Sequence, residues 1–130
     1  MTNSTILKAM GLCLLAAVAG AAPAAASQEI AGDARKGAAV FKAKCGFCHA
    51  IKADTHKMGP SMAGIYGMKA GTTGFERYLG LRDVDFVWDN ETLDGFLKDP
   101  REFLGRGTTM PTEMRSARDR AHLIAYLKTL

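Results

Sequence analysis

Two cysteines separated by two residues and followed at once by a histidine constrain this chain more than any other feature. Cys45, Cys48 and His49 form a Cys-x-x-Cys-His sequence. Two thiols at this spacing can add across the two vinyl groups of one porphyrin edge, and the next residue then lies under the iron, where an imidazole nitrogen can bind it. The motif predicts one covalently bound haem, with Cys45 and Cys48 as attachment residues and His49 as an axial iron ligand.

Two other kinds of site use a similar cysteine pair. A thioredoxin-like redox pair would need a β-α-β pattern around it, and no segment shows a convincing period-two alternation of apolar residues. A zinc site would need two further ligands at matching spacing, and only His56 and His122 remain. We expect His122 on the surface of the last helix. Haem attachment is therefore favoured over both alternatives.

The start of the chain reads as an export leader. Lys8 and the amino terminus supply positive charge, residues 11–18 form an apolar core, and Ala24-Ala25-Ala26 fits a small-x-small cleavage pattern. The alternative, an uncleaved membrane anchor, is weakened because the apolar stretch is short of a full span of about 20 residues. We expect residues 1–26 to be a cleaved signal peptide and residues 27–130 to be a soluble domain in the periplasm.

Length and charge exclude several classes of protein. The part after the leader suits one domain with one core, so an enzyme with both a nucleotide fold and a substrate domain is excluded. The chain has 17 Lys and Arg against 13 Asp and Glu, a formal net charge of +4. This excess suggests acidic partners but is too small to imply nucleic acid. No segment after the leader is apolar enough to insert stably in a membrane.

Apolar residues recur at helical spacing, so the chain is expected to be all-α. The predicted N-caps of its three main helices are Asp33, Asp89 or Asn90, and Ser116. Gly37 lies inside the first helix and predicts a close backbone contact with another element. Pro100 is expected to end the second helix, and residues 61–66 are expected to form a short helical turn.

Six short sequences occur in a fixed order along the chain. They are Gly32-Asp33-x-x-Lys36-Gly37, Cys45-x-x-Cys48-His49, His56-Lys57-x-Gly59-Pro60, Trp88 with Glu91-Thr92-Leu93, Gly107-Thr108-x-Met110, and Leu123-Ile124-Ala125-Tyr126-Leu127. From residue 32 to residue 130 this set resembles the class I cytochromes c of mitochondria and bacteria. The resemblance implies helices wrapped around one covalently bound haem c, with the N- and C-terminal helices in contact.

The resemblance also implies roles for residues around the haem. Met110 is the expected second axial iron ligand, with Met58 and Met114 as the other candidates. The carbonyl of Pro60 is expected to accept a hydrogen bond from the ligand imidazole, and the Trp88 indole to donate one to a haem propionate. A thioether opposite a histidine raises the reduction potential, as suits an electron carrier.

The chain departs from the family pattern near the haem. Met68 stands where the family has an arginine near a propionate, Leu81 where it has an internal asparagine, and Phe96 where it has a tyrosine near the methionine sulfur. Arg77 stands where another tyrosine reaches the propionate, with Tyr78 next to it. We therefore expect fewer hydrogen bonds around this haem than is usual in the family.

The resemblance implies a respiratory-chain electron carrier rather than an enzyme. Such a monomeric protein moves one electron from a quinol-oxidising complex or a dehydrogenase to a terminal oxidase or another acceptor. Partners are expected to dock on a basic ring around the exposed haem edge, formed by Lys44, Lys57 and Arg101, with Arg115 near it. The alternatives are a haem subunit of a dehydrogenase complex, and a haem protein whose labile sixth ligand gives way to a small molecule.

Overall fold

The computed structural model describes residues 30–130, so the expected signal peptide lies outside the described residues. The elements are α1 (Ala34–Lys44), the 3-10 helix η1 (Leu79–Leu81), α2 (Asn90–Lys98), α3 (Pro100–Leu104) and α4 (Ala117–Leu127). Among these residues, strand pairing is limited to one bridge between Lys69 and Val87. The all-α prediction is confirmed. None of the described helices is long and apolar enough to cross a membrane.

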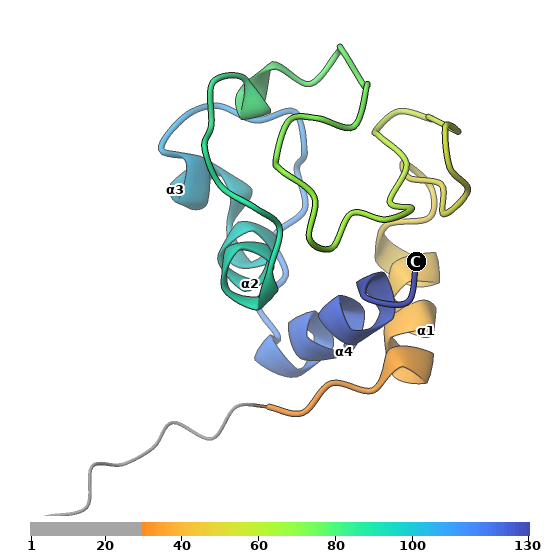
Figure 1. Cartoon of the computed structure of the whole chain (residues 1–130). Coiled ribbons are helices and arrows are strands. Elements are labelled where there is room, and N and C mark those ends of the chain that lie inside the picture. The colour runs from red at the N-terminus through yellow and green to blue at the C-terminus, as the bar shows by residue number, and fades with distance from the viewer. Residues whose placement is uncertain (1–29) are drawn as a thin grey trace, which may run out of the picture.

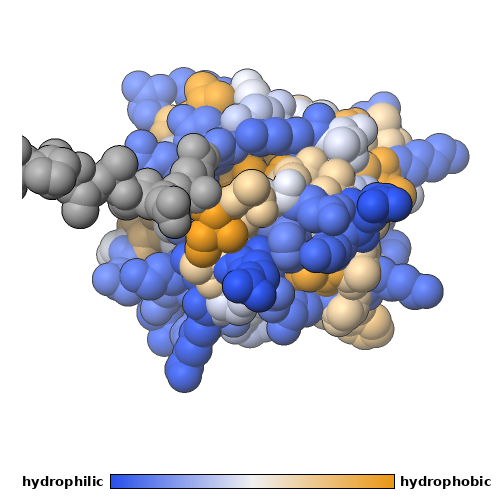
Figure 2. Space-filling model, turned by 90° about the horizontal axis from the view of Figure 1, so that it is seen from below, coloured by the Kyte–Doolittle hydropathy of each residue, from blue (hydrophilic) through white to orange (hydrophobic). Residues whose placement is uncertain are grey.

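Figure 1 shows how the helices enclose the centre of the molecule. The first and last helices, α1 and α4, lie against each other, while α2 and α3 lie on the other side of the molecule. The long connection from α1 to α2, drawn in yellow and green, covers the remaining sides. Figure 2 views the molecule from below, where hydrophilic residues in blue cover most of the visible face and hydrophobic residues in orange form small groups between them. Apolar side chains of α1, α2 and α4, such as Phe41, Leu93 and Leu123, are buried.

The contact between α1 and α4 depends on a glycine, which has no side chain. Gly37 is buried, and a Cβ placed on it would overlap the carbonyl oxygen of His122. Next to this point the Phe41 and Tyr126 rings pack with their centroids 5.7 Å apart, and Leu123 is 1% exposed. The predicted contact between the terminal helices, and the reason for a glycine in the first of them, are confirmed.

The expectation that His122 is a surface residue is wrong. Its side chain is buried, and its Nδ1 accepts a hydrogen bond of 2.9 Å from the backbone N–H of Asp33. The carboxylate of Asp33 accepts the next N–H groups, those of Arg35 and Lys36, and cannot also serve its own N–H. The imidazole supplies the missing acceptor across the helix contact, a role that no local pattern could indicate.

Local capping signals proved accurate for two further helices. Asp89, rather than Asn90, caps α2, because its carboxylate accepts from the N–H of Thr92 while the Thr92 hydroxyl accepts from the N–H of Asp89. Ser116 caps α4 by accepting from the N–H of Asp119. Such side chains satisfy N–H groups that the first turn of a helix leaves unpaired.

The α-helix α3 and the short 3-10 helix η1 were not predicted from the sequence. The second helix does end before Pro100, at Lys98, but Pro100 is also the first residue of α3. Asp99 accepts hydrogen bonds from the first free N–H groups of α3, and Gly105 ends it in the left-handed region with φ of 60°. Proline suits a first helical position because its missing N–H has no intrahelical partner there.

The short helix expected over residues 61–66 does not form. The Ser61 hydroxyl donates to the carbonyl of Lys52 at 2.6 Å and accepts from the N–H of Ala63 at 3.2 Å, and Gly64 has a φ of 66°. A serine side chain that bonds to nearby backbone groups offers the chain an alternative to helix. This segment is therefore a series of turns.

The close approach at Gly37 can be tested with a single methyl group. We expect Gly37→Ala to lower the free energy of unfolding by about 2 kcal/mol, because overpacking a tight contact costs about 1–3 kcal/mol. Guanidinium unfolding of the haem-loaded protein, followed by circular dichroism, measures this change.

Gly107→Ala is the matched control, since a Cβ at Gly107 meets nothing within 4 Å. It should leave stability nearly unchanged. If Gly37→Ala instead stabilised the protein by about 1 kcal/mol, as helix propensity alone would predict, the described contact between α1 and α4 would be wrong.

Candidate functional site

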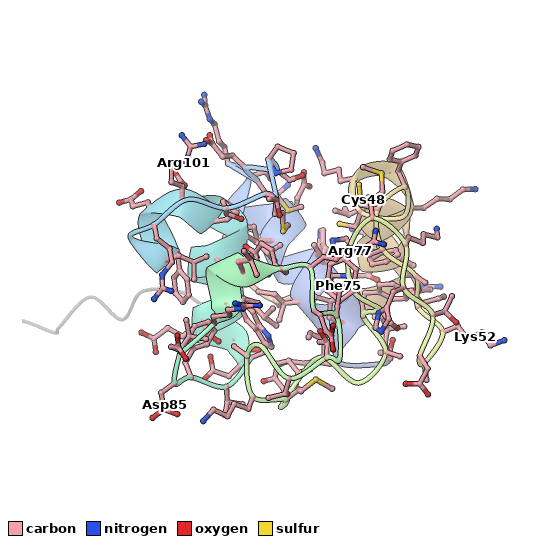
Figure 3. All side chains as sticks on the ribbon, turned by 90° about the horizontal axis from the view of Figure 1, so that it is seen from above. Cys48, Lys52, Phe75, Arg77, Asp85 and Arg101 are labelled. Carbon is pink, nitrogen blue, oxygen red and sulfur yellow. The ribbon has the colours of Figure 1, made fainter. Side chains whose placement is uncertain are left out.

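One cavity collects the residues that the sequence singled out. It has a volume of about 400 Å³ and lies between α1, α2, α4 and the long loops. All six predicted site residues line it: Cys45, Cys48, His49, Pro60, Trp88 and Met110. Figure 3, seen from above, shows Cys48 at the end of α1 and Arg101 across the molecule on α3. A largely apolar cavity with a few convergent polar groups is typical of a cofactor site.

The two cysteines follow directly from the end of α1. The carbonyl of Cys45 accepts from the N–H groups of both Cys48 and His49, at 3.0 and 2.9 Å, so the motif winds into one tight turn. Both thiols are free, and burial raises the pKa of the Cys45 thiol to about 11. Redox-active cysteine pairs have a thiolate stabilised by a lowered pKa, so this environment does not support a thioredoxin-like pair.

The imidazole of His49 is oriented by the backbone that faces it. Its Nδ1 lies 2.7 Å from the carbonyl oxygen of Pro60. Because a carbonyl can only accept, Nδ1 carries the proton, and Nε2 retains the lone pair that can bind a metal. Burial lowers the pKa of His49, a shift that the Pro60 bond partly opposes and the Lys57 charge reinforces. The lowered pKa favours the neutral ring, which is the form that binds a metal.

Glycine is needed where the chain passes the imidazole. A Cβ at Gly59 would lie 2.9 Å from the Nδ1 atom of His49. The backbone of Gly59 also accepts from the N–H of Lys57 at 3.0 Å and donates to the carbonyl of Cys48 at 2.9 Å. The Gly59-Pro60 pair thus forms the back of the histidine site.

The two remaining histidines do not complete a zinc site. His56 accepts a hydrogen bond from the N–H of Ser61 at 3.1 Å, and its ring centroid lies 5.5 Å from that of Phe75. Both contacts hold the loop that contains His56. His122 is engaged with α1, as described above. The described residues contain no group of three or more His, Cys, Asp or Glu side chains that could hold a metal ion. The zinc alternative finds no support in this part of the chain.

The candidate methionine ligands differ in position. Met110 is half-buried in the cavity wall and comes from the segment after α3, which Figure 1 shows on the opposite side of the centre from the end of α1. Met58 also lines the cavity, but it precedes the Gly59-Pro60 pair that backs His49, and it is 68% exposed. Met114 is buried in the hydrophobic core, with 2% of its surface exposed. Of these three, Met110 is the one that lines the cavity and is also half-buried.

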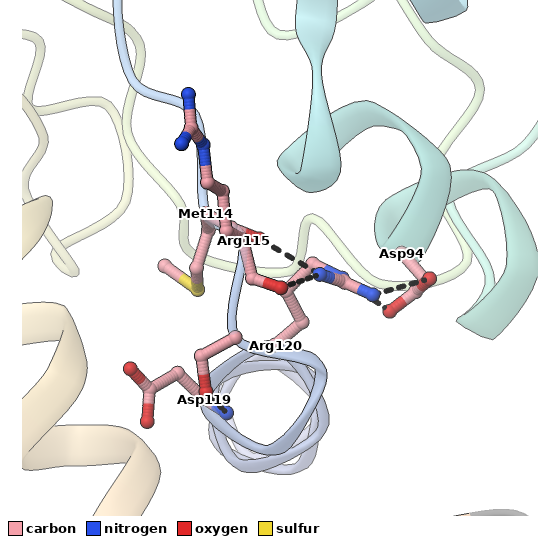
Figure 4. A network of polar contacts seen from close by, with 6 residues as sticks. Asp94, Met114, Arg115, Asp119 and Arg120 are labelled. Atoms are coloured by element: carbon pink, nitrogen blue, oxygen red, sulfur yellow. Dashed lines mark hydrogen bonds and ion pairs between the residues drawn. The ribbon is translucent and has the colours of Figure 1, made fainter.

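A buried arginine fixes the chain after Met110 (Figure 4). Arg120 donates to the carbonyls of Met114 and Arg115, at 2.8 and 3.0 Å, and pairs with Asp94 on α2 at 2.7 Å. Arg120 was not singled out from the sequence. The sequence does contain an indication of its role. Arg120 lies three positions before Leu123, on the apolar stripe of α4, and a charged residue at such a position needs buried partners.

Trp88 is held in the cavity wall by its neighbours. Its ring packs edge-on against Phe86 and Phe96, with centroid distances of 4.9 and 5.0 Å. Its backbone N–H donates to the carbonyl of Met68 at 2.9 Å, and its carbonyl accepts from Gly67 at 2.7 Å. These contacts fix the indole, while its bond to a propionate stays a prediction.

The departures from the family pattern change the character of the wall. Leu81 and Phe96 line the cavity and make it apolar, as expected. Arg77 is exposed, and Figure 3 shows it near Phe75 on the same loop. Its neighbour Tyr78 lines the cavity instead and brings a hydroxyl group that was not expected there from the sequence.

The residues present suit a haem. A thiol pair and an imidazole whose Nε2 is free of the Pro60 bond follow the end of α1, a thioether comes from the segment after α3, and apolar and aromatic side chains complete the lining. Thioether and imidazole are known axial donors to haem iron, and paired cysteines are its covalent attachment points.

Comparison with known proteins agrees with this geometry. The family model described as Cytochrome c matches residues 34–130. The chain is 37% identical over 98 residues to a cytochrome c of Theileria annulata, covering 75% of this chain and 85% of that one. It is 34% identical over 101 residues to a cytochrome c of Euglena viridis, covering 76% and 98%.

A solved structure gives the same result. The chain superposes on cytochrome cH from Methylobacterium extorquens with a TM-score of 0.68 and 32% sequence identity, covering 76% of this chain and all of that one. Sequence, fold and cavity agree, and the chain belongs to the cytochrome c family of electron carriers, which bind one covalently attached haem c.

Proposed function

We propose that this protein is a periplasmic one-electron carrier in which His49 and Met110 are the axial ligands of the haem iron. The observation that carries the proposal is that both cysteines, the His49 imidazole and the Met110 thioether line one cavity. The haem supplies a redox centre that accepts and releases one electron. The periplasmic location rests on the leader pattern of residues 1–26.

The chain contributes three things to that chemistry. Pro60 orients the His49 ring and keeps its Nε2 available as a ligand. Side chains such as Leu81, Phe96 and Trp88 surround the cavity with apolar surface, which excludes water and tunes the potential. If His49 and Met110 both bind the iron, they would leave it no position open to a substrate, and for this reason the protein is proposed to be a carrier rather than an enzyme.

Replacing Met110 tests the ligation. We expect Met110→Ala to remove the weak far-red absorption band of iron–thioether bonding in the ferric protein and to let external imidazole bind tightly. The reason is that Met110 is a half-buried methionine of the cavity wall and comes from the loop opposite the end of α1. Absorption spectra of the ferric protein with and without imidazole measure both changes.

Two variants serve as controls. Met58→Ala changes an exposed methionine of the same cavity, and Met114→Ala a buried one, and both should keep the band. Met114→Ala should also lower stability by about 2–5 kcal/mol, as is usual for truncating a buried methionine. A band that survived Met110→Ala, or disappeared in either control, would assign the ligand to another residue.

We also propose that redox partners dock beside Cys45 and Cys48, through the basic residues near them. We call this surface the cysteine edge. Lys44 lies at the rim of the cavity, and the Lys57 ammonium donates to the carbonyl of Gly46 at 2.6 Å, which holds its charge beside the motif. Arg101 on α3 and Arg115 before α4 are exposed, and Figure 3 shows Arg101 across the molecule from Cys48. An acidic partner surface would be attracted to this side of the molecule.

Charge reversal tests this electrostatic attraction. We expect Lys44→Glu to slow oxidation of the ferrous protein by anionic ferricyanide several-fold at low salt, and to accelerate oxidation by a cationic cobalt(III) complex. Stopped-flow rates between about 0.01 and 0.15 M ionic strength measure the effect, since the screening length falls from about 30 to 8 Å over this range.

Arg118→Glu makes the same change of charge in the first turn of α4 and is the control. It should have much less effect on either rate. Equal effects at both positions, or rates that do not depend on salt, would show that the residues around the cysteine edge do not steer encounter.

A further inference from the structure

A chain of hydrogen bonds joins the loop that carries Met110 to the turn before η1. The hydroxyl oxygens of Tyr78 and Thr108 lie 2.5 Å apart, and the backbone N–H of Met110 donates to the Thr108 hydroxyl at 3.1 Å. Tyr78 and Thr108 are 30 positions apart, so this contact is made by the fold rather than by local turn geometry. The three residues form a connected polar path that ends at the backbone of Met110.

Close packing supports the same contact. Gly80 is buried beside the Tyr78 ring, where a Cβ would lie 3.3 Å from the phenol oxygen and 3.4 Å from the carbonyl oxygen of Gly107. The Arg106 guanidinium donates to the carbonyl of Arg82 at 3.1 Å, which joins the same two segments a second time. The Tyr78 ring is thus held between the turn before η1 and the loop that carries Met110.

The direction of the bonds follows from their chemistry. A threonine oxygen can accept two hydrogen bonds and donate one. The Thr108 oxygen accepts one hydrogen bond from the Met110 N–H and has room to accept a second. The phenol of Tyr78 is more acidic than the threonine hydroxyl, so it is the donor of this second bond. Burial raises the pKa of Tyr78, so the phenol keeps the proton that it donates.

The loop that carries Met110, between α3 and α4, is held in different ways at its two ends. After Met110, the chain is fixed by Arg120 and by the bond from the Met114 N–H to the carbonyl of Leu97 at 2.8 Å. Before Met110, residues 105–107 are exposed, and Gly105 has a left-handed φ of 60°. The side of the loop before Met110 therefore depends on the contacts of Thr108 and Arg106.

We propose that Tyr78 is a positioning residue for the axial thioether: through Thr108 it fixes the backbone of Met110 and restrains the loop from opening. The inference rests on the proposed ligation by Met110. It gives Tyr78 a role that differs from direct contact with a propionate, and it places a hydroxyl network in a wall where the sequence predicted fewer hydrogen bonds.

Imidazole binding to the ferric protein measures how readily the loop opens, because the external ligand binds only after the thioether has left. The apparent affinity is proportional to the open fraction. We expect Tyr78→Phe to raise the imidazole affinity several-fold and Thr108→Val to raise it by about tenfold, which corresponds to about 1.4 kcal/mol. Both variants should keep the far-red thioether band when imidazole is absent.

Three further variants complete the test. The double variant Tyr78→Phe/Thr108→Val should bind imidazole no more tightly than Thr108→Val alone, because the two hydroxyl groups act in series. Thr108→Ser keeps the oxygen and should stay close to the original affinity. Tyr66→Phe removes a phenol that bonds to Asn90 instead, at 3.2 Å, and should change nothing.

The possible outcomes separate the positioning role from the ligation. If Tyr78→Phe leaves imidazole affinity unchanged, or if its effect adds fully to that of Thr108→Val, the positioning role of Tyr78 is wrong. A lower unfolding midpoint with unchanged imidazole affinity also overturns that role, since it shows a merely structural tyrosine. If Met110→Ala keeps the far-red band, the ligation itself is wrong, and this result is independent of Tyr78.

Discussion

The contact of α1 with α4 at Gly37 is the constraint on which the rest of the structure depends. Where two helix backbones approach this closely, the residue between them cannot carry a side chain. The crossing buries Phe41 and Leu123, and it fixes the direction in which α1 points. Since Cys45 follows immediately after α1, the same contact determines where the thiols and the His49 imidazole enter the cavity.

The other side of the cavity is held by hydrogen bonds rather than by a helix contact. Met110 belongs to a loop without helix or strand, so its position comes from bonds at both ends: the Tyr78–Thr108 pair before it and Arg120 after it. A side chain on such a loop lacks the regular backbone bonds that hold a residue directly after a helix. The cavity therefore combines a histidine side that follows directly from a helix with a methionine side that depends on a few hydrogen bonds.

Local signals predicted much of the fold and of the site, and long-range contacts account for what was missed. Asp33 and Ser116 were identified as caps because capping is decided within three or four residues. His122 was misjudged, and Tyr78 was given no role, because their partners lie far away in sequence, 89 and 30 positions from them. The cavity residues were found through the resemblance and the Cys-x-x-Cys-His motif, whose spacing encodes its chemistry directly.

A crystal structure of the ferric, haem-loaded protein would test the proposed ligation most directly, because it shows which atoms bind the iron. We predict His49 Nε2 and Met110 Sδ at opposite axial positions, with His49 Nδ1 still bonded to the carbonyl of Pro60. Iron bound by Met58, by another side chain or by a water molecule in place of Met110 would contradict this ligation.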